Sequence, residues 1–163
     1  MPISSAFRSG AAITVLVASF CAMPSSGFAQ TDPWLGTWRL NPAKSSFNPG
    51  PGPRALTTTY EGVPGGYRVI ADFTDAQGRQ GRSEWPIIFD GRRHRVTGNP
   101  QTDEVASRRI DAYTGQDEYF KDGQPDGSAT FVLSRDGKII TSTTRRLLAN
   151  GREANNVFVF EKQ

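Results

Sequence analysis

The sequence predicts an all-β protein, with a single antiparallel up-and-down β-barrel of about eight to ten strands. Runs of five to nine residues alternate between apolar and polar side chains, and turn pairs that contain glycine separate them. After residue 29 no stretch shows a convincing helical pattern. Most of the runs follow one another in hairpin succession. Such a meander leaves exposed edges unless the sheet closes, which favours a barrel.

The first 29 residues are set apart from this domain by their composition. Arg8 precedes the apolar run AAITVLVASFCAM, and Gly27 and Ala29 occupy positions where a signal peptidase reads small residues. The run is shorter than the roughly 20 residues of a membrane span. We therefore expect a signal peptide over residues 1–29, cleaved after Ala29, and a barrel domain over residues 30–163. The domain is expected to be periplasmic or secreted, with no integral membrane segment.

The alternating runs give the expected strands. In residues 66–74 one face carries Tyr67, Val69, Ala71 and Phe73, with Ile70 on the other, and in residues 82–89 one face carries Ser83, Trp85, Ile87 and Phe89. Asp136–Gly137 suits a two-residue hairpin turn, because both residues tolerate positive φ angles. Pro86 indicates an edge, a bulge or an opening in the barrel wall. In chain order the runs occupy residues 34–41, 57–61, 66–74, 82–89, 128–135, 138–147 and 155–162.

The segment from Asn41 to Ala55 does not look like a strand, because it contains four prolines and two glycines. We expect it to run over the surface or across one end of the barrel as a loop or lid, with Phe47 tucked beneath it. A linker between two domains is the alternative interpretation. The few residues that precede it are too short to form a domain, so the loop is preferred.

The opening strand contains a G-x-W motif, Gly36 and Trp38. Gly36 allows close backbone approach, and Trp38, two residues on, can plug the closed end of a barrel. This motif resembles the opening of calycin barrels, the lipocalins and fatty-acid-binding proteins. In lipocalins a late arginine packs across the tryptophan ring, so the resemblance implies a cation–π contact from either Arg145 or Arg146.

The resemblance extends over nearly the whole chain after residue 29. The pattern is similar to that of a group of small exported bacterial proteins of lipocalin-like type, and it is carried by LGTWRLNPAKSSFNPGPGP, TTTYE, FDGRRHRVTGNPQTDEVASRRID and NNVFVFEKQ. Lipocalin-type cysteines are absent, and the Pro/Gly segment replaces the helix pair that caps fatty-acid-binding proteins. A fatty-acid ligand would therefore be an analogy from fold alone.

Few residues suggest catalysis or metal binding. The only histidine is His94, and the only cysteine, Cys21, lies in the leader, which excludes the usual zinc and copper sites. We expect no metal and no other cofactor. Nucleophile elbows, phosphate-binding loops and dinucleotide fingerprints are also missing. The remaining catalytic hypothesis is a general acid–base pair of carboxylates, drawn from Asp72, Glu84 and Asp111.

Arginine pairs recur at residues 92–93, 108–109 and 145–146. Adjacent strand residues point to opposite faces, so one arginine of each pair could face the interior and attract a carboxylate or phosphate head group. The alternative is that these arginines form surface ion pairs, with partners among Glu104, Asp111 and Glu153. Nucleic acid is not an expected partner, because the formal net charge is only +3 and export is expected.

The sequence thus predicts a non-catalytic barrel that binds a small apolar or amphiphilic molecule. Two other functions stay open. One is an envelope structural or protein-interaction module with a side-chain-filled barrel, for which exposed aromatics such as Trp34 and Tyr113 would matter. The other is an enzyme with carboxylates at the barrel mouth. The ligand-contacting candidates are Tyr60, Tyr67, Phe73, Trp85, Phe89, Arg109, Tyr119 and Phe131.

Overall fold

The computed structural model describes residues 32–148 and 150–163, and the predicted signal peptide over residues 1–29 lies outside them. No helix in the described range is long and apolar enough to cross a membrane. Within this range the chain forms one 3-10 turn, η1 (Pro42–Lys44), and eleven strands. These are β1 (Gly36–Leu40), β2 (Ser46–Asn48), β3 (Ala55–Val63), β4 (Gly66–Thr74), β5 (Gln80–Ile88), β6 (Arg93–Arg95), β7 (Glu104–Asp111), β8 (Thr114–Lys121), β9 (Gln124–Leu133), β10 (Ile139–Leu147) and β11 (Glu153–Lys162).

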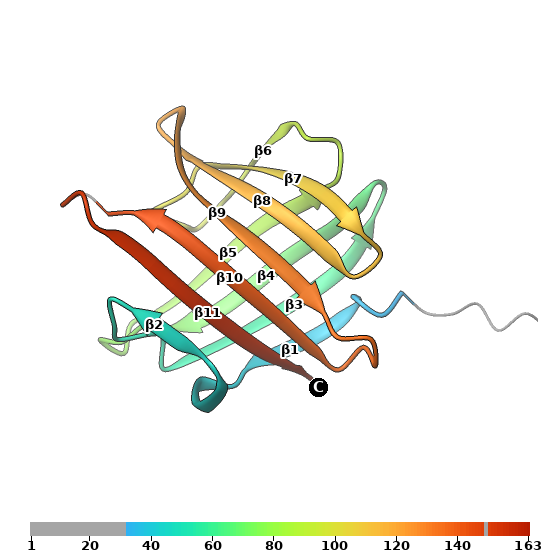
Figure 1. Ribbon diagram of the computed structural model, residues 1–163, viewed down its shortest axis with the longest axis horizontal. Coiled ribbons are helices and arrows are strands. Elements are labelled where there is room, and N and C mark those ends of the chain that lie inside the picture. The colour runs from blue at the N-terminus through green and yellow to red at the C-terminus, as the bar shows by residue number, and fades with distance from the viewer. Residues whose placement is uncertain (1–31, 149) are drawn as a thin grey trace, which may run out of the picture. The chain divides into compact units, whose positions relative to one another are not determined.

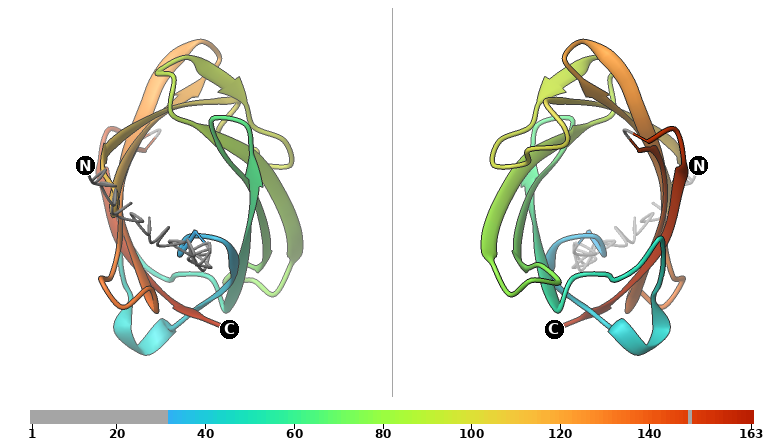
Figure 2. Two further views of the ribbon diagram at one scale, coloured as in Figure 1. Left: turned by 90° about the vertical axis from the view of Figure 1, so that its right-hand side faces the viewer. Right: turned by 90° about the vertical axis from the view of Figure 1, so that its left-hand side faces the viewer.

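All of the strands belong to one antiparallel sheet that curls into a nearly closed barrel (Figure 1). The hydrogen-bonded order is β5-β4-β3-β1-β11-β10-β9-β8-β7-β6, and β2 pairs with β11 off this path. Successive strands are therefore neighbours almost everywhere, and the two views of Figure 2 show them encircling a common axis. The predicted fold class, an antiparallel barrel of eight to ten strands, is confirmed.

The barrel closes through a short seam between β5 and the segment that follows β6. Glu84 and Thr97 exchange two backbone hydrogen bonds across it, with N···O distances of 2.9 and 2.8 Å. Pro86 lies two residues further along β5 and has no N–H to extend this ladder. β5 is accordingly the last strand of the hydrogen-bonded order. Of the edge, bulge or opening that Pro86 indicates in the sequence, the structure has a sheet edge.

The Pro/Gly segment stays within the barrel domain and lies along its rim. After η1, β2 pairs with β11 at residues 155–157, continuing the line of β1, which pairs with residues 160–162. Phe47 packs edge-on against Phe158, with ring centroids 5.1 Å apart. Gly52 lies directly over the Phe47 ring, where an added Cβ would come within 2.2 Å of it. The absence of a side chain at Gly52 thus lets the segment fold down over Phe47, as expected.

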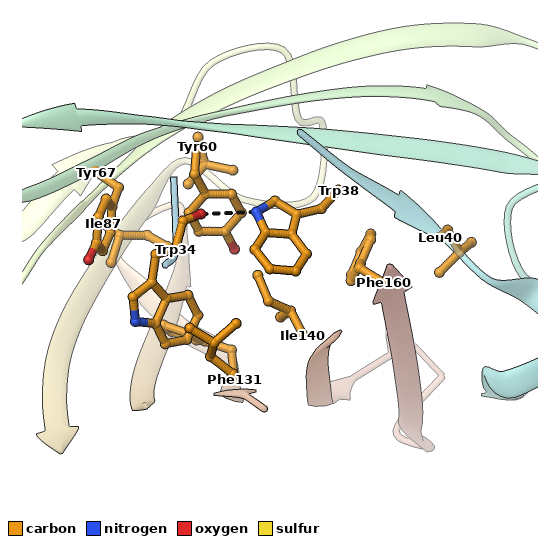
Figure 3. Packing of buried hydrophobic residues seen from close by; sticks show 11 residues of the cluster. Trp34, Trp38, Leu40, Tyr60, Tyr67, Ile87, Phe131, Ile140 and Phe160 are labelled. Atoms are coloured by element: carbon orange, nitrogen blue, oxygen red, sulfur yellow. Dashed lines mark hydrogen bonds between the residues drawn. The ribbon is translucent and has the colours of Figure 1, made fainter. Parts of the chain in front are cut away.

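One end of the barrel is filled by aromatic side chains (Figure 3). Trp38 is wholly buried, and its indole N–H donates a 2.9 Å hydrogen bond to the carbonyl of Trp34. Gly36, between them, has a φ of +117°, a conformation that other residues rarely adopt. Trp34 is itself only 3% exposed and packs edge-on against Phe131 at 5.6 Å. The expectation of Trp34 as an exposed aromatic is wrong: it forms the plug together with Trp38.

The cation over Trp38 is a lysine and not the expected arginine. Lys162 is the cross-strand partner of Trp38, and its Nζ lies 4.9 Å from the centroid of the indole ring. Arg145 is exposed on the outer face, and Arg146 lies over the ring of Tyr119 at 4.5 Å. Both arginines come from the far end of β10, whereas the register of β1 on β11 brings Lys162 to the plug.

Candidate ligand-binding site

A cavity of about 610 Å³ occupies the part of the barrel away from the Trp38 plug. Its walls come from β3, β4, β5, β8, β10 and β11, and it opens between the loop residues 51–53, 75–77 and 99–101. This volume falls in the range of roughly 300–1,000 Å³ that is typical of small-molecule sites. The Pro/Gly segment therefore contributes one side of the opening.

Apolar and aromatic side chains make up much of the wall. Phe158 and Phe160 are two residues apart on β11, so they point to the same side, and their rings lie nearly parallel with centroids 6.2 Å apart. Trp85 on β5 is the cross-strand partner of Val69 on β4. The apolar residues of the strands that line the cavity are Leu56, Ala71, Phe73, Trp85, Phe158 and Phe160.

Several polar groups on the wall have unused hydrogen-bonding capacity. Tyr60 and Tyr119 line the cavity, and burial raises the pKa of both phenols, so both are uncharged at neutral pH. Burial and neighbouring charges, with no hydrogen bond from a described residue, act on the two phenols. The hydroxyl of Thr58 and the indole N–H of Trp85 are also buried without a partner in the described range. Buried polar groups are normally paired, so these groups are available to a bound molecule.

The basic side chains of the wall are already matched by carboxylates. Arg146 is paired with Asp126, and its other terminal nitrogen donates to the hydroxyl of Thr102 at 2.6 Å. At the opening, Nε of Arg79 lies 2.7 Å from a carboxylate oxygen of Asp75. Among the described residues, the wall thus offers a negatively charged head group no cation that lacks a carboxylate partner.

Asp117 lies inside the barrel next to this wall. It is 3% exposed, and one carboxylate oxygen accepts a 2.6 Å hydrogen bond from the hydroxyl of Ser107. The other oxygen has no partner within the described part of the chain. Burial raises the pKa of Asp117 to about 7, against the opposing effect of the bond from Ser107. After burial, the charge of Asp117 is the next contribution to the raised phenol pKa of Tyr60 and Tyr119.

Asp117 is not among the site residues expected from the sequence. The available signal was its position two residues before Tyr119 on the same strand, because alternate residues share a face. If Tyr119 faces the interior, then Asp117 does so too. A charged residue on an inward face is the exception that marks a candidate site.

Half of the predicted ligand-contacting side chains line the cavity, and the others belong to the closed end. Tyr67 and Phe131 are in the buried plug, and Phe89 packs against it. Those that line the cavity are Tyr60, Phe73, Trp85 and Tyr119. Period-two alternation identifies which side chains face inward. It does not give the height along each strand at which the plug ends and the cavity begins.

Arg109 also lies at the closed end, where it joins a polar contact outside the cavity. Its guanidinium stacks 4.0 Å from the ring centroid of Phe89 and donates a 3.4 Å hydrogen bond to the hydroxyl of Tyr67. That hydroxyl donates in turn to Asp32 at 2.6 Å. Arg109 therefore helps to tie the segment before β1 to the barrel wall.

The carboxylates considered for catalysis lie away from the cavity. Asp72 and Glu84 pair with arginines on the outer face, and an oxygen of Asp111 accepts from the backbone N–H of Tyr113. His94 contacts Asp90 at 3.0 Å. In the described residues no group of three or more metal-ligating side chains is present. Two of the expected surface partners do pair with arginines: Glu104 with Arg93 and Glu153 with Arg145.

The chain forms a barrel that is plugged by aromatic side chains at one end and hollow at the other. Apolar rings and unpaired polar groups line the hollow part, and a buried carboxylate lies beside it. A scan against protein-family models and a search of the curated proteins each returned no match.

Proposed function

We propose that this protein is a non-catalytic barrel that binds a small apolar or amphiphilic molecule after export to the periplasm or the cell exterior. The observation that carries this proposal is the cavity of about 610 Å³ at the open end of the barrel. A structural or interaction module would need no such space, and small barrels without ligands are filled by side chains. The cavity thus favours ligand binding over that alternative.

The chemistry of the wall supports an apolar or amphiphilic ligand. Transfer of apolar surface from water is favourable by roughly 25 cal/mol per Å², so the rings of Phe73, Trp85 and Phe158 provide affinity without specificity. The buried, unpaired hydroxyl of Thr58 and the indole N–H of Trp85 can each form a directional hydrogen bond with the ligand. The G-x-W opening at Gly36 and Trp38, together with the barrel, supports a lipocalin-like relationship as part of this proposal.

The first experiment is native mass spectrometry of the protein purified from an exporting cell without detergent. We expect a mass excess in the native spectrum that disappears when the same sample is denatured. That mass gives the first information on the ligand. The bare polypeptide mass in both spectra, combined with failure to bind the probe described next, would favour the side-chain-filled module instead.

A matched pair of variants tests whether binding takes place in the cavity. Thr144 lines it, whereas the adjacent Thr143 is exposed on the outer face of the same strand. The probe is N-phenyl-1-naphthylamine, an uncharged dye that fluoresces in apolar surroundings. We expect saturable binding at one site, weakened about tenfold or more by Thr144→Trp, a loss of about 1.4 kcal/mol. Thr143→Trp should leave it unchanged, and equal effects of the two variants contradict an interior site.

A further inference from the structure

Three oxygen-bearing side chains mark the inner end of the cavity: Tyr60 and Tyr119 line it, and Asp117 is buried next to Tyr119 on the same face of β8. Tyr60, on β3, belongs both to the cavity wall and to the buried plug, so it marks the boundary between them. Tyr119 and Asp117 lie two residues apart on the same face of β8. We call Tyr60, Tyr119 and Asp117 the inner polar cluster. Among the described residues, Ser107 donates a hydrogen bond to one oxygen of Asp117, and no hydrogen bond acts on the two phenols or on the second carboxylate oxygen.

The inner polar cluster contains no cation. Ser107 on β7 and Ala129 on β9 are the cross-strand neighbours of Asp117, and both are neutral. Arg146 on β10 lies over the ring of Tyr119, and it is paired with Asp126. A carboxylate removed from water needs a compensating positive charge or several hydrogen bonds. Asp117 receives one bond, from Ser107, so its charge is left uncompensated.

A protonated amine would supply the positive charge and the hydrogen-bond donors that this cluster lacks. An ammonium group has three N–H donors and no acceptor, which matches the three free oxygens of the cluster. Aromatic faces around a site also attract cations, and Tyr60, Tyr119, Trp85 and Phe160 line this cavity. An anionic head group would instead meet the charge of Asp117 without a free cation to offset it.

We infer that the ligand is an amphiphile with a protonated amine head group, which contacts Asp117, Tyr60 and Tyr119, while its apolar tail extends toward the opening. This inference rests on the proposed function and specifies the ligand class of the same cavity. No covalent step is involved.

The test compares three ligands that share a ten-carbon tail and differ in their head groups. Decylamine, decanol and decanoate are titrated calorimetrically at pH 8 into the wild-type protein, Asp117→Asn and the control Asp72→Asn. Asp72 is exposed and pairs with Arg82, so this control makes the same charge change on the outer face. We expect the wild type to bind decylamine about ten- to a hundredfold more tightly than decanol, as for hydrogen bonds to a charged group. Decanoate should bind most weakly.

The variants and the pH dependence separate the possible outcomes. Asp117→Asn should reduce the preference for decylamine to within about threefold, and Asp72→Asn should retain it. If Asp117→Asn does not fold, the wild type alone still gives the answer. Its affinity for decylamine should fall between pH 8 and pH 5 as Asp117 takes up a proton, while its affinity for decanol should change little. Over this range decylamine stays charged, like a lysine side chain.

Two results would overturn the inference, and they are distinguishable. If decanol or decanoate binds as tightly as decylamine, the amine assignment is wrong and the binding function stands. If none of the three ligands binds, and the naphthylamine dye does not bind either, then the proposed function fails as well.

Discussion

Trp38 joins the first strand to both the plug and the last strand. It has no exposed surface, donates a hydrogen bond to Trp34 and lies beneath Lys162. Truncation of a large buried aromatic side chain costs about 3–5 kcal/mol, so Trp38→Ala should lower the free energy of unfolding by that amount. Urea unfolding followed by circular dichroism measures it. Trp38→Phe keeps most of the apolar volume, so its free energy of unfolding should fall less. An unchanged urea midpoint for Trp38→Ala would contradict a stabilising role of Trp38 in the plug.

The raised pKa of Asp117 leads us to expect that the free energy of unfolding falls as the pH rises. Its pKa is raised from 3.8 to about 7 in the folded protein, so between these values the folded state holds a proton that the unfolded chain has released. The free energy of unfolding should therefore decrease from about pH 4 to about pH 7 and then level off, by up to about 4 kcal/mol. Asp117→Asn does not titrate. The urea midpoint of each protein is measured at pH 4.5 and at pH 8, and the extra change in the wild type isolates this contribution. An equal change of midpoint in the wild type and the variant would contradict it.

At the scale of elements, the seam that closes the barrel depends on a glycine. Gly98 has a φ of +70°, and an added Cβ would lie 2.0 Å from the carbonyl oxygen of Arg82 on β5. Because that neighbour is backbone, Gly98→Ala must push the seam apart, and we expect a loss of about 1–3 kcal/mol. Gly91→Ala is the control, since Gly91 has the same φ but open space around it. Hydrogen exchange should speed up at the amides of Glu84 and Thr97 in Gly98→Ala only.

The elements also show which strands a hydrophobic pattern can predict. The run at residues 66–74 matches β4 residue for residue, because the inward face of that strand is apolar. β7 and β8 are not among the alternating runs. Their inward positions include Ser107, Gly115 and Asp117, so alternation in hydrophobicity is lost there. Ser107 and Asp117 thus have two effects: they break the alternating pattern that would predict these two strands, and they make the barrel interior polar.

At the scale of the whole molecule, the closed barrel and its plugged end could be predicted from the turn spacing and the G-x-W motif. The boundary between plug and cavity could not, because it depends on how far each strand is shifted relative to its neighbours. Tyr60 and Tyr67 illustrate this. They are diagonal neighbours on β3 and β4, because Tyr60 pairs with Val69 and Tyr67 pairs with Gly62, yet Tyr60 lines the cavity and Tyr67 does not. For the same reason the register, and not composition, places Lys162 over Trp38.

The two ends of the cavity are built by different elements, and this separates two properties of ligand exchange. If the cavity binds an amphiphile as proposed, head-group selection belongs to the inner polar cluster on β3 and β8, whereas passage in and out belongs to the loops at residues 51–53, 75–77 and 99–101. A loop that hinders passage slows association and dissociation by the same factor, so the equilibrium constant is preserved. Residence time can thus be altered at the loops without altering which molecule is chosen, and the reverse holds for substitutions in the cluster.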